Sequence, residues 1–316
     1  MQTYYSGVNT TPENERVKAL SEACLDRSYS TAVPHYITEQ RKKSQSIVET
    51  IFLTFYGRKI VILTLDVGNT QITGGLWDED KLVLTFRRTT AVGNSSDEIG
   101  IFMRSVIREN GFHWQKIDRI GICSVVPSIN YSLSSALTKY FTNNVLFIQA
   151  GIKTGLKIKY ANPKEIGADR IAGAIGAVAL HPGKNLVIID MGTATTIDCV
   201  TKNSEYLGGA ILSGLRISME ALATGTAKLP SVEISKPDHI CGTSTIEAIQ
   251  SGLFYGNAGA LKEFIYLYEK NVFKGEKPYV LGTGGFSRIF EQYNLFNEIS
   301  PELVLLGVKK ALELNN

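Results

Sequence analysis

The chain has 316 residues, of which 44% are hydrophobic and 20% are charged, a composition typical of a folded globular protein and unlike that of a disordered one. The formal net charge of +3 is small for this length and gives no reason to expect binding to nucleic acid. Four scattered cysteines without a CxxC pair exclude the usual structural zinc spacings and favour a reducing, cytoplasmic location. No apolar run approaches the roughly 18 residues of a transmembrane helix, so no membrane association is expected.

The beginning of the chain differs from the rest. Residues 1–58 are polar, carry charges of both signs and contain no glycine-rich turn between strand-like runs. We expect them to form an extension that is partly helical or disordered, with weak helices over 12–26 and 37–55. Beyond this extension the pattern predicts two domains of ordinary size, over 59–160 and 161–316.

The first domain is predicted to contain three short strands followed by alternating helices and strands. Apolar runs of strand length separated by glycine, asparagine and aspartate turns support this order. The expected elements are strands at 59–70, 71–78 and 81–90, a helix at 96–110, a strand at 117–126, a helix at 129–141 and a strand at 145–150.

The second domain repeats this theme after a helix of small residues. Its predicted elements are a helix at 167–181, a strand pair within 185–201, a strand at 206–214, helices at 216–224 and 245–268, a strand at 278–285 and a helix at 301–314. The two halves are therefore built alike, which indicates an α/β fold with an internal repeat.

The repeat includes a chemical motif. An apolar strand runs into Asp66 and continues as DVGNT, and a second runs into Asp190 and continues as DMGTAT. A plain β-hairpin explains either copy alone, because Asn and Gly are common turn residues. Two facing hairpins could instead hold the phosphates of a nucleotide, with a cation beside the carboxylates. The P-loop and the GxGxxG fingerprint are absent.

Six motifs occur in the order seen in one family. They are DVGNT, GADR, DMGTATTID, YLGGAILSGL, TAKLP and TIEAIQSGLFYG. Over residues 60–312 the chain resembles the type III pantothenate kinases, although that family commonly has proline where Ser213 stands. The resemblance implies two RNase H-like domains of the actin-like, sugar-kinase-like ATPase superfamily, with a nucleotide cleft between them. It also implies ATP-dependent phosphorylation of pantothenate to 4′-phosphopantothenate, the first step of coenzyme A biosynthesis.

The resemblance also implies roles for individual residues. The first phosphate hairpin, and with it the ATP site, matches Asp66, Val67, Gly68, Asn69, Thr70, Gln71, Ile72 and Thr73, and the second hairpin contributes Thr193. Asp190 matches the ligand of a monovalent cation, potassium or ammonium, which acts beside the magnesium that accompanies ATP. The pantothenate site matches Tyr160, Gly167, Ala168, Asp169 and Arg170, with Asp169 as the general base. Thr245 matches a residue that reaches the substrate from the other subunit of a homodimer.

Simpler interpretations stand beside these roles. Asp169 could merely favour the positive end of a helix, and Tyr160 could be a loop aromatic. Asp198 is expected on the solvent side of its strand, and LGTGG at 281–285 is either a plain turn or a close approach to adenosine. A nucleotide-binding regulatory relative without catalysis is the alternative function. A sugar or acetate kinase is disfavoured, because those families lack GADR and TIEAIQSG.

Overall fold

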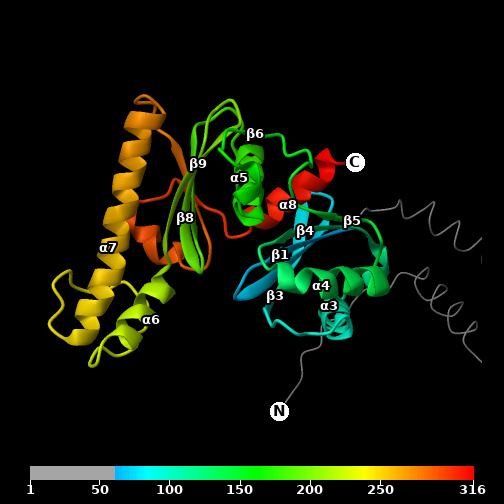
Figure 1. Cartoon of the computed structure of the whole chain (residues 1–316), viewed down its shortest axis with the longest axis horizontal. Coiled ribbons are helices and arrows are strands. Elements are labelled where there is room, and N and C mark those ends of the chain that lie inside the picture. Colours follow the sequence, from blue (N-terminus) through cyan, green and yellow to red (C-terminus); the bar gives the residue numbers. More distant parts are fainter. Residues whose placement is uncertain (1–60) are drawn as a thin grey trace, which may run out of the picture. The chain divides into compact units, whose positions relative to one another are not determined.

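The structure is a computed structural model that describes residues 61–316, and this part of the chain is built on two β-sheets flanked by helices. The expected extension at 1–58 and its two helices lie outside the described residues. The described part forms a mixed α/β fold, as the sequence predicts, and the sheets and helices can be followed in Figure 1.

The first sheet has five strands in the order β3-β2-β1-β4-β5. Strands β1 to β3 form an antiparallel meander, and β4 and β5 run parallel to β1. Helices α3 and α4 pack against each other on one face of this sheet (Figure 1). The bounds are β1 Val61–Val67, β2 Gln71–Asp78, β3 Lys81–Thr89, α3 Ser96–Glu109, β4 Ile117–Ser124, α4 Pro127–Tyr140 and β5 Val145–Phe147.

Local sequence explains where these helices begin. Ser95 accepts a hydrogen bond from the backbone N–H of Glu98, whose side chain accepts one from the backbone of Ser95, so a capping box starts α3. Pro127 occupies the first turn of α4, where its missing N–H costs no helical hydrogen bond. The two helices then bury isoleucines and leucines against β1 and β4.

The second sheet repeats the arrangement of the first. Its order is β11-β10-β7-β8-β9-β6, in which β7 to β9 are antiparallel and β10 and β11 run parallel to β7. This repetition confirms the internal repeat. The bounds are β6 Lys157–Ile158, β7 Leu186–Met191, β8 Ala194–Val200, β9 Glu205–Ser213, β10 Tyr279–Thr283 and β11 Glu298–Ile299.

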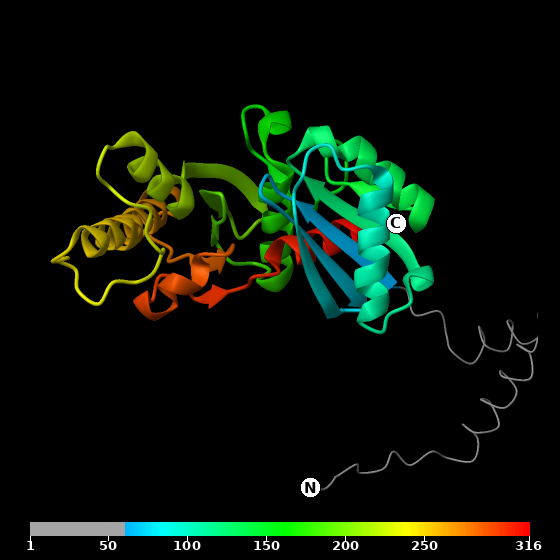
Figure 2. The same ribbon diagram turned by 90° about the horizontal axis from the view of Figure 1, so that it is seen from below.

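Helices cover both faces of the second sheet. The core of one face joins α7 to β7 and β8, and the core of the other joins α5 to the same strands, so α7 and α5 lie on opposite sides of the sheet in Figures 1 and 2. The bounds are α5 Ala168–Leu180, α6 Leu215–Gly225, α7 Thr245–Leu267 and α8 Leu303–Leu314, with short helical turns at Trp114–Lys116, Pro163–Glu165, Tyr268–Val272 and Ser287–Tyr293.

Helices α5 and α8 cross in close backbone contact. A Cβ atom on Gly307 would collide with the backbone carbonyl of Ala172, and one on Gly176 would collide with that of Leu303. Helix α8 also packs against β1 and β4 of the first sheet. The glycines therefore allow the backbones of α5 and α8 to approach closely at this crossing, beside which Ile175 of α5 packs with Val304 and Val308 of α8.

Within the described residues, every helix is too short or too polar to cross a lipid bilayer.

Candidate active site

The first hairpin motif lies at the end of β1, in the middle of its sheet. Asp66 is paired with Thr73 on one side and with Cys123 on the other. The chain then turns through Gly68, whose N–H donates to the carbonyl of Gln71 at 3.0 Å, and Thr90 from the end of β3 donates its hydroxyl to the Gly68 carbonyl at 2.6 Å. The turn is therefore held from two sides.

The predicted ATP-binding residues along this hairpin differ in exposure, and Asp66, Gly68 and Thr73 are partly buried. Val67 and Ile72 are buried in the core and anchor it. Asn69, Thr70 and Gln71 are exposed at the turn. Of this stretch, the turn residues are the ones that offer side chains and N–H groups to a ligand.

The second hairpin repeats this geometry and meets the first. Asp190 is paired with Thr196 and Thr283 on its two sides, and Gly192 donates its N–H to the carbonyl of Ala194 at 3.0 Å. Across the two sheets, the hydroxyls of Thr70 and Thr193 are 3.0 Å apart. The structure thus brings both predicted phosphate hairpins together.

The LGTGG segment lies beside the second hairpin. Gly284 has φ of +82°, and a Cβ atom there would collide with the carboxylate of Asp190. The N–H of Phe286 donates to the carbonyl of Met191 at 3.1 Å. The segment is therefore a tight glycine turn against the Asp190 carboxylate, where only glycine fits.

Asp169 lies in the first turn of α5, next to the helix start at Gly167 and Ala168. Its Oδ1 accepts a hydrogen bond from the backbone N–H of Arg170 at 2.7 Å. Burial raises the pKa of Asp169, although the hydrogen bond and charge of Arg170 oppose this. A carboxyl group with a raised pKa is a better proton acceptor than an ordinary aspartate once it is ionised.

Three aspartates from β1, β7 and α5 share this region. Burial raises the pKa of Asp66 to about 7, and repulsion from Asp190 and Asp169 adds to the rise. Burial likewise raises the pKa of Asp190 to about 7, with added repulsion from Asp169 and Asp198. Like charges held this closely disfavour joint ionisation unless a cation is present.

The aspartates fit a cation that is shared with a substrate. In the part of the chain that the structure describes, neither Asp66 nor Asp190 forms a salt bridge, so both negative charges lack a cationic partner. The same part contains no group of three or more His, Cys, Asp or Glu side chains arranged to hold a metal ion. Magnesium is commonly bound by one or two carboxylates together with substrate phosphates, and the carboxylates present suit that mode.

Arg170 lies in a buried polar network next to Asp169. Its Nε and Nη2 atoms donate to Oδ1 of Asp198 at 3.0 and 2.5 Å, and the hydroxyl of Tyr206 donates to the same oxygen at 2.6 Å. Burial opposes the charge of Arg170, but hydrogen bonds and attraction from Asp198 raise its pKa above the usual range. Tyr160 contributes to the raised pKa of Arg170 as well, and its ring lies 6.4 Å from that of Tyr206.

The expectation that Asp198 lies on the solvent side of its strand is wrong, because the residue is 2% exposed. Both faces of β8 are covered by helices, so a carboxylate in this strand requires a partner. The sequence pattern TTIDCV predicted a strand, but the burial of Asp198 and the identity of its partner depend on tertiary structure. No role was predicted for Tyr206, because no sequence motif indicates that its hydroxyl binds the Asp198 carboxylate.

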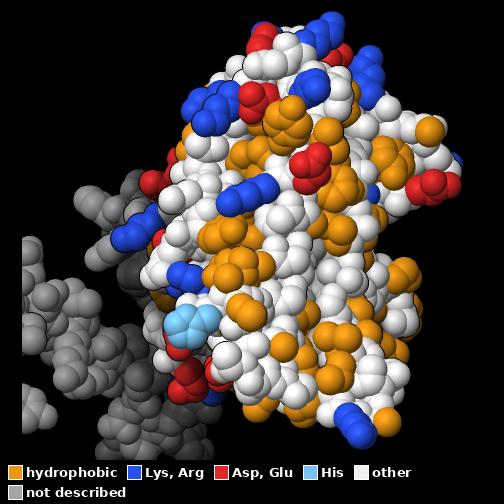
Figure 3. All heavy atoms as spheres, turned by 90° about the vertical axis from the view of Figure 1, so that its left-hand side faces the viewer, with side chains coloured by type: hydrophobic (Ala, Val, Ile, Leu, Met, Phe, Trp, Pro, Cys, Tyr) orange, Lys and Arg blue, Asp and Glu red, His pale blue; other side chains and the backbone are white. Residues whose placement is uncertain are grey.

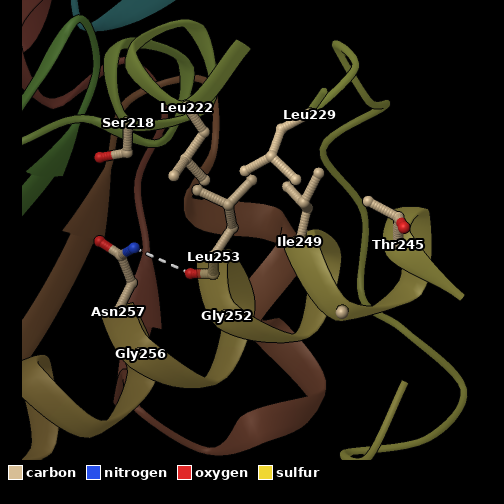
Figure 4. A pocket seen from close by; sticks show the side chains of 10 residues that line it. Ser218, Leu222, Leu229, Thr245, Ile249, Gly252, Leu253, Gly256 and Asn257 are labelled. Carbon is tan, nitrogen blue, oxygen red and sulfur yellow. Dashed lines mark hydrogen bonds between the residues drawn. The ribbon is translucent and has the colours of Figure 1, made fainter. Parts of the chain in front are cut away.

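Thr245 is not brought together with the other predicted substrate residues. It begins α7, on the opposite side of the second sheet from α5 (Figure 1). There it lines a pocket of about 620 Å³ between α6 and α7, with Ser218, Leu222, Ile249 and Asn257 (Figure 4). Ser213 lies near the start of α6, and its hydroxyl is 2.9 Å from that of Ser218.

Comparison with known proteins decides the family. The sequence model of the type III pantothenate kinases matches residues 62–266. The chain belongs to the type III pantothenate kinase family. A type III pantothenate kinase of Legionella pneumophila (strain Corby) is 51% identical over 255 residues, which cover 81% of this chain and 99% of that protein. One from Elusimicrobium minutum is 48% identical over the same shares of the two chains.

A solved structure supports the fold of this type III pantothenate kinase family member. A protein from Campylobacter jejuni, described as a conserved Baf family transcriptional activator, superposes with a TM-score of 0.51 over 79% of this chain and 97% of its own. The two sequences are 21% identical, so this likeness shows the fold alone. The α/β architecture with two sheets is thus shared with an independently determined structure.

Proposed function

We propose that this protein transfers the γ-phosphoryl group of ATP to the primary hydroxyl of pantothenate and forms 4′-phosphopantothenate, the first step of coenzyme A biosynthesis. The observation that carries the proposal is the meeting of Asp66, Asp190 and Asp169 beside two facing hairpin turns, in a chain of the type III pantothenate kinase family. The nucleotide-binding regulatory relative has no observation in its favour.

ATP phosphates are expected to lie between the two hairpins. The exposed residues Asn69, Thr70 and Thr193 offer short polar side chains and backbone N–H groups, which suit anionic oxygens. The LGTGG turn leaves room for close approach of the nucleoside to the backbone near Gly285, where a Cβ atom would meet no other atom within 4 Å. Because phosphoryl transfer needs chiefly positioning and charge neutralisation, this arrangement suffices for the nucleotide half of the reaction.

Asp66 and Asp190 are the residues that would hold the cations of the reaction. We assign Asp66 to the magnesium that accompanies ATP and Asp190 to a monovalent cation, potassium or ammonium. Such cations neutralise the charge that develops on the phosphoryl oxygens. The fit rests on the hard oxygen ligands and on the absence of a salt bridge to either carboxylate within residues 61–316.

Asp169 is the proposed general base. A primary alcohol is a weak nucleophile at neutral pH, and a carboxylate within hydrogen-bond reach can accept its proton as the bond to phosphorus forms. The other two aspartates are committed to cations. The remainder of the pantothenate site is proposed to comprise Gly167, Ala168, Arg170 and Tyr160, of which Tyr160 lies beside Tyr206, whose hydroxyl shares the Asp198 carboxylate with Arg170.

We further propose a homodimer in which Thr245 completes the partner's pantothenate site. Thr245 is remote from α5 within its own chain. It begins α7, and the face of the molecule on the α7 side is rich in apolar side chains (Figure 3). On this side of the second sheet Ile246 is 52% and Ile217 41% exposed. Apolar surface of this kind on α6 and α7 is typical of a face covered by another protein chain.

The domain division is proposed to lie near residue 160, with a first domain over 59–160 and a second over 161–316. It follows the two sheets except for the short strand β6, which precedes this boundary but pairs with β9 of the second sheet. Cys123, Cys199 and Cys241 are free thiols, which is consistent with action in the reducing cytoplasm where ATP is available.

A coupled assay for ADP release, with and without pantothenate, tests the activity. We expect release that depends on pantothenate, together with a product heavier by one phosphoryl group in mass spectrometry. ATP binding without pantothenate-dependent release would favour the regulatory alternative.

Complementation tests the dimer. The Asp169→Asn and Thr245→Ala variants should each have low activity, and mixing them under conditions of subunit exchange should restore part of it. One of the two sites in such a mixed dimer would combine an intact Asp169 with an intact Thr245. No recovery in mixtures shown to contain mixed dimers would contradict the shared site.

A further inference from the structure

Asp198 is a buried carboxylate to which the proposed reaction assigns no role. It is 2% exposed, near the middle of β8, and its side chain accepts hydrogen bonds from Arg170 and from the hydroxyl of Tyr206, which is itself fully buried. Burying an ion pair costs desolvation free energy that its own attraction often fails to offset. Stabilisation of the fold is therefore a weak explanation for the presence of this ion pair next to Asp169.

The geometry of the pair fixes one edge of the guanidinium group. Nε of Arg170 lies 3.0 and 3.2 Å from the two carboxylate oxygens of Asp198, and Nη2 lies 2.5 Å from one of them. A guanidinium is planar and carries five N–H donors. With the Nε–Nη2 edge occupied, the Nη1 donors point along a direction set by the protein.

Tyr206 fixes the carboxylate in turn. Its hydroxyl donates to Oδ1 of Asp198 at 2.6 Å, and its ring lies 6.4 Å from that of Tyr160, measured between centroids. Tyr160 approaches the same guanidinium. Arg170, a long side chain with several rotatable bonds, is thereby held by groups from two neighbouring segments before any substrate binds.

We propose that Asp198 is a positioning residue for pantothenate, which acts by locking Arg170 so that its free N–H donors face the substrate, with Tyr206 as the support of the lock. The inference rests on the proposed function, because it assumes that Arg170 contacts pantothenate. Without the lock, Arg170 remains charged but samples several rotamers, and its flexible guanidinium can turn towards the neighbouring Asp169 carboxylate. Substrate binding would then include the cost of ordering the side chain again.

The test begins with Asp198→Asn, which keeps the shape of the side chain but removes its charge. Hydrogen bonds to charged groups are stronger than neutral ones, so kcat/KM for pantothenate should fall by about 10- to 100-fold. KM for ATP should stay within about twofold of the wild-type value, since Thr70 and Thr193 are untouched. Asp97→Asn, which removes an exposed carboxylate of α3 paired with Lys139 of α4, is the matched control and should leave both constants unchanged.

A double-mutant cycle separates positioning from a general structural role. In an Arg170→Gln background, Asp198→Asn should reduce kcat/KM for pantothenate by less than about threefold, because the residue that it orients is absent. Equal losses in the two backgrounds, or a parallel rise in KM for ATP, would overturn the proposal. Tyr206→Phe removes only the supporting hydroxyl and should show a smaller loss with the same selectivity for pantothenate; it provides the test if Asp198→Asn does not fold.

An activity-independent measurement distinguishes failure of this proposal from failure of the proposed function. In protein labelled with ¹⁵N-arginine, the Nε–H resonance of Arg170, assigned by its loss in Arg170→Gln, should be protected from exchange in the wild type and lose that protection in Asp198→Asn. An unchanged resonance overturns the lock even if the enzyme is active. A resonance that responds as expected in a protein without pantothenate-dependent turnover supports the lock and instead refutes the assigned reaction.

Discussion

The hydroxyl groups of Thr70 and Thr193 lie 3.0 Å apart, although 123 positions separate the two residues in the chain. Each belongs to the turn of a hairpin that follows an aspartate-bearing strand, one in each sheet. The contact makes the two turns a single surface, to which a phosphate group could bind from both sides.

The first prediction concerns these two hydroxyls. Thr70→Val and Thr193→Val should each raise KM for ATP by about tenfold, the loss expected from one hydrogen bond to a charged group, while KM for pantothenate changes little. Thr70→Ser keeps the hydroxyl and serves as the control. If both valine variants bound ATP as the wild type does, in a direct titration, the hairpins would not be the phosphate site.

The second prediction concerns stability and pH in the absence of added cations. Asp66 and Asp190 have pKa values of about 7 in the folded protein, against an ordinary value of 3.8. The folded state therefore binds protons more tightly than the unfolded state. The resulting stability is fully present below about pH 4 and is lost as the pH rises through about 7.

Thermal unfolding between pH 5 and 8 in EDTA measures this loss. The melting temperature should fall across this range more steeply in the wild type than in Asp66→Asn, and magnesium should reduce the fall because it binds the ionised carboxylates. Identical slopes for the wild type and the variant would show that Asp66 does not titrate as described.

The third prediction concerns the monovalent cation. If the oxygens around Asp190 form a site for a large monovalent ion, activity should rise with potassium or ammonium and hardly at all with sodium at equal ionic strength. Asp190→Asn should weaken this dependence. Full activity in a buffer that contains sodium alone would contradict the assignment of Asp190.

The fourth prediction concerns the base. Asp169→Asn keeps the shape of the side chain but cannot accept the proton of the attacking hydroxyl, so kcat should fall by about 10²- to 10⁴-fold while ATP binding is little changed. Steady-state kinetics and an ATP titration measure the two effects. A kcat within about threefold of the wild-type value would mean that another group is the base.

The fifth prediction concerns the crossing of α5 and α8. Gly307→Ala should destabilise the protein by about 1–3 kcal/mol or more, because the new Cβ would collide with the carbonyl of Ala172. Gly173→Ala in the same pair of helices meets no atom within 4 Å, so it should be neutral or stabilising by up to about 1 kcal/mol through helix propensity. Denaturant unfolding of the two variants gives the comparison, and equal stabilities would show that the helices separate at little cost.

The sequence predicted most of the elements because their signals are local. The repeated pattern of an apolar strand, an aspartate and a glycine-containing turn located both hairpins around Asp66 and Asp190, and hydrophobic periodicity located the longer helices. Strands β6 and β11 went unpredicted, since two-residue strands have no period of their own. They form only because a longer neighbouring strand is available for pairing.

The partners of buried charged residues could not be predicted from the sequence. Asp198 and Arg170 are 28 positions apart, on a strand and a helix that meet only in the folded chain. Alternation along TTIDCV did not reveal that both faces of β8 are covered. A charged residue on such a strand can be recognised as paired, but its partner depends on how α5 packs on the sheet.

The glycine crossing also has a consequence for the chemistry. Asp169 begins α5, Asp66 ends β1, and α8 contacts both of these elements. Where helices meet through side chains, evolution can alter their spacing by a few tenths of an ångström through exchange of one residue for another. Gly176 and Gly307 bring main chain against main chain, so the van der Waals radii of backbone atoms set the spacing there. The crossing therefore fixes the distance between α5, which carries the proposed base, and α8, which packs against the strand of the first phosphate hairpin. Substitutions of side chains elsewhere in the two helices cannot change that distance.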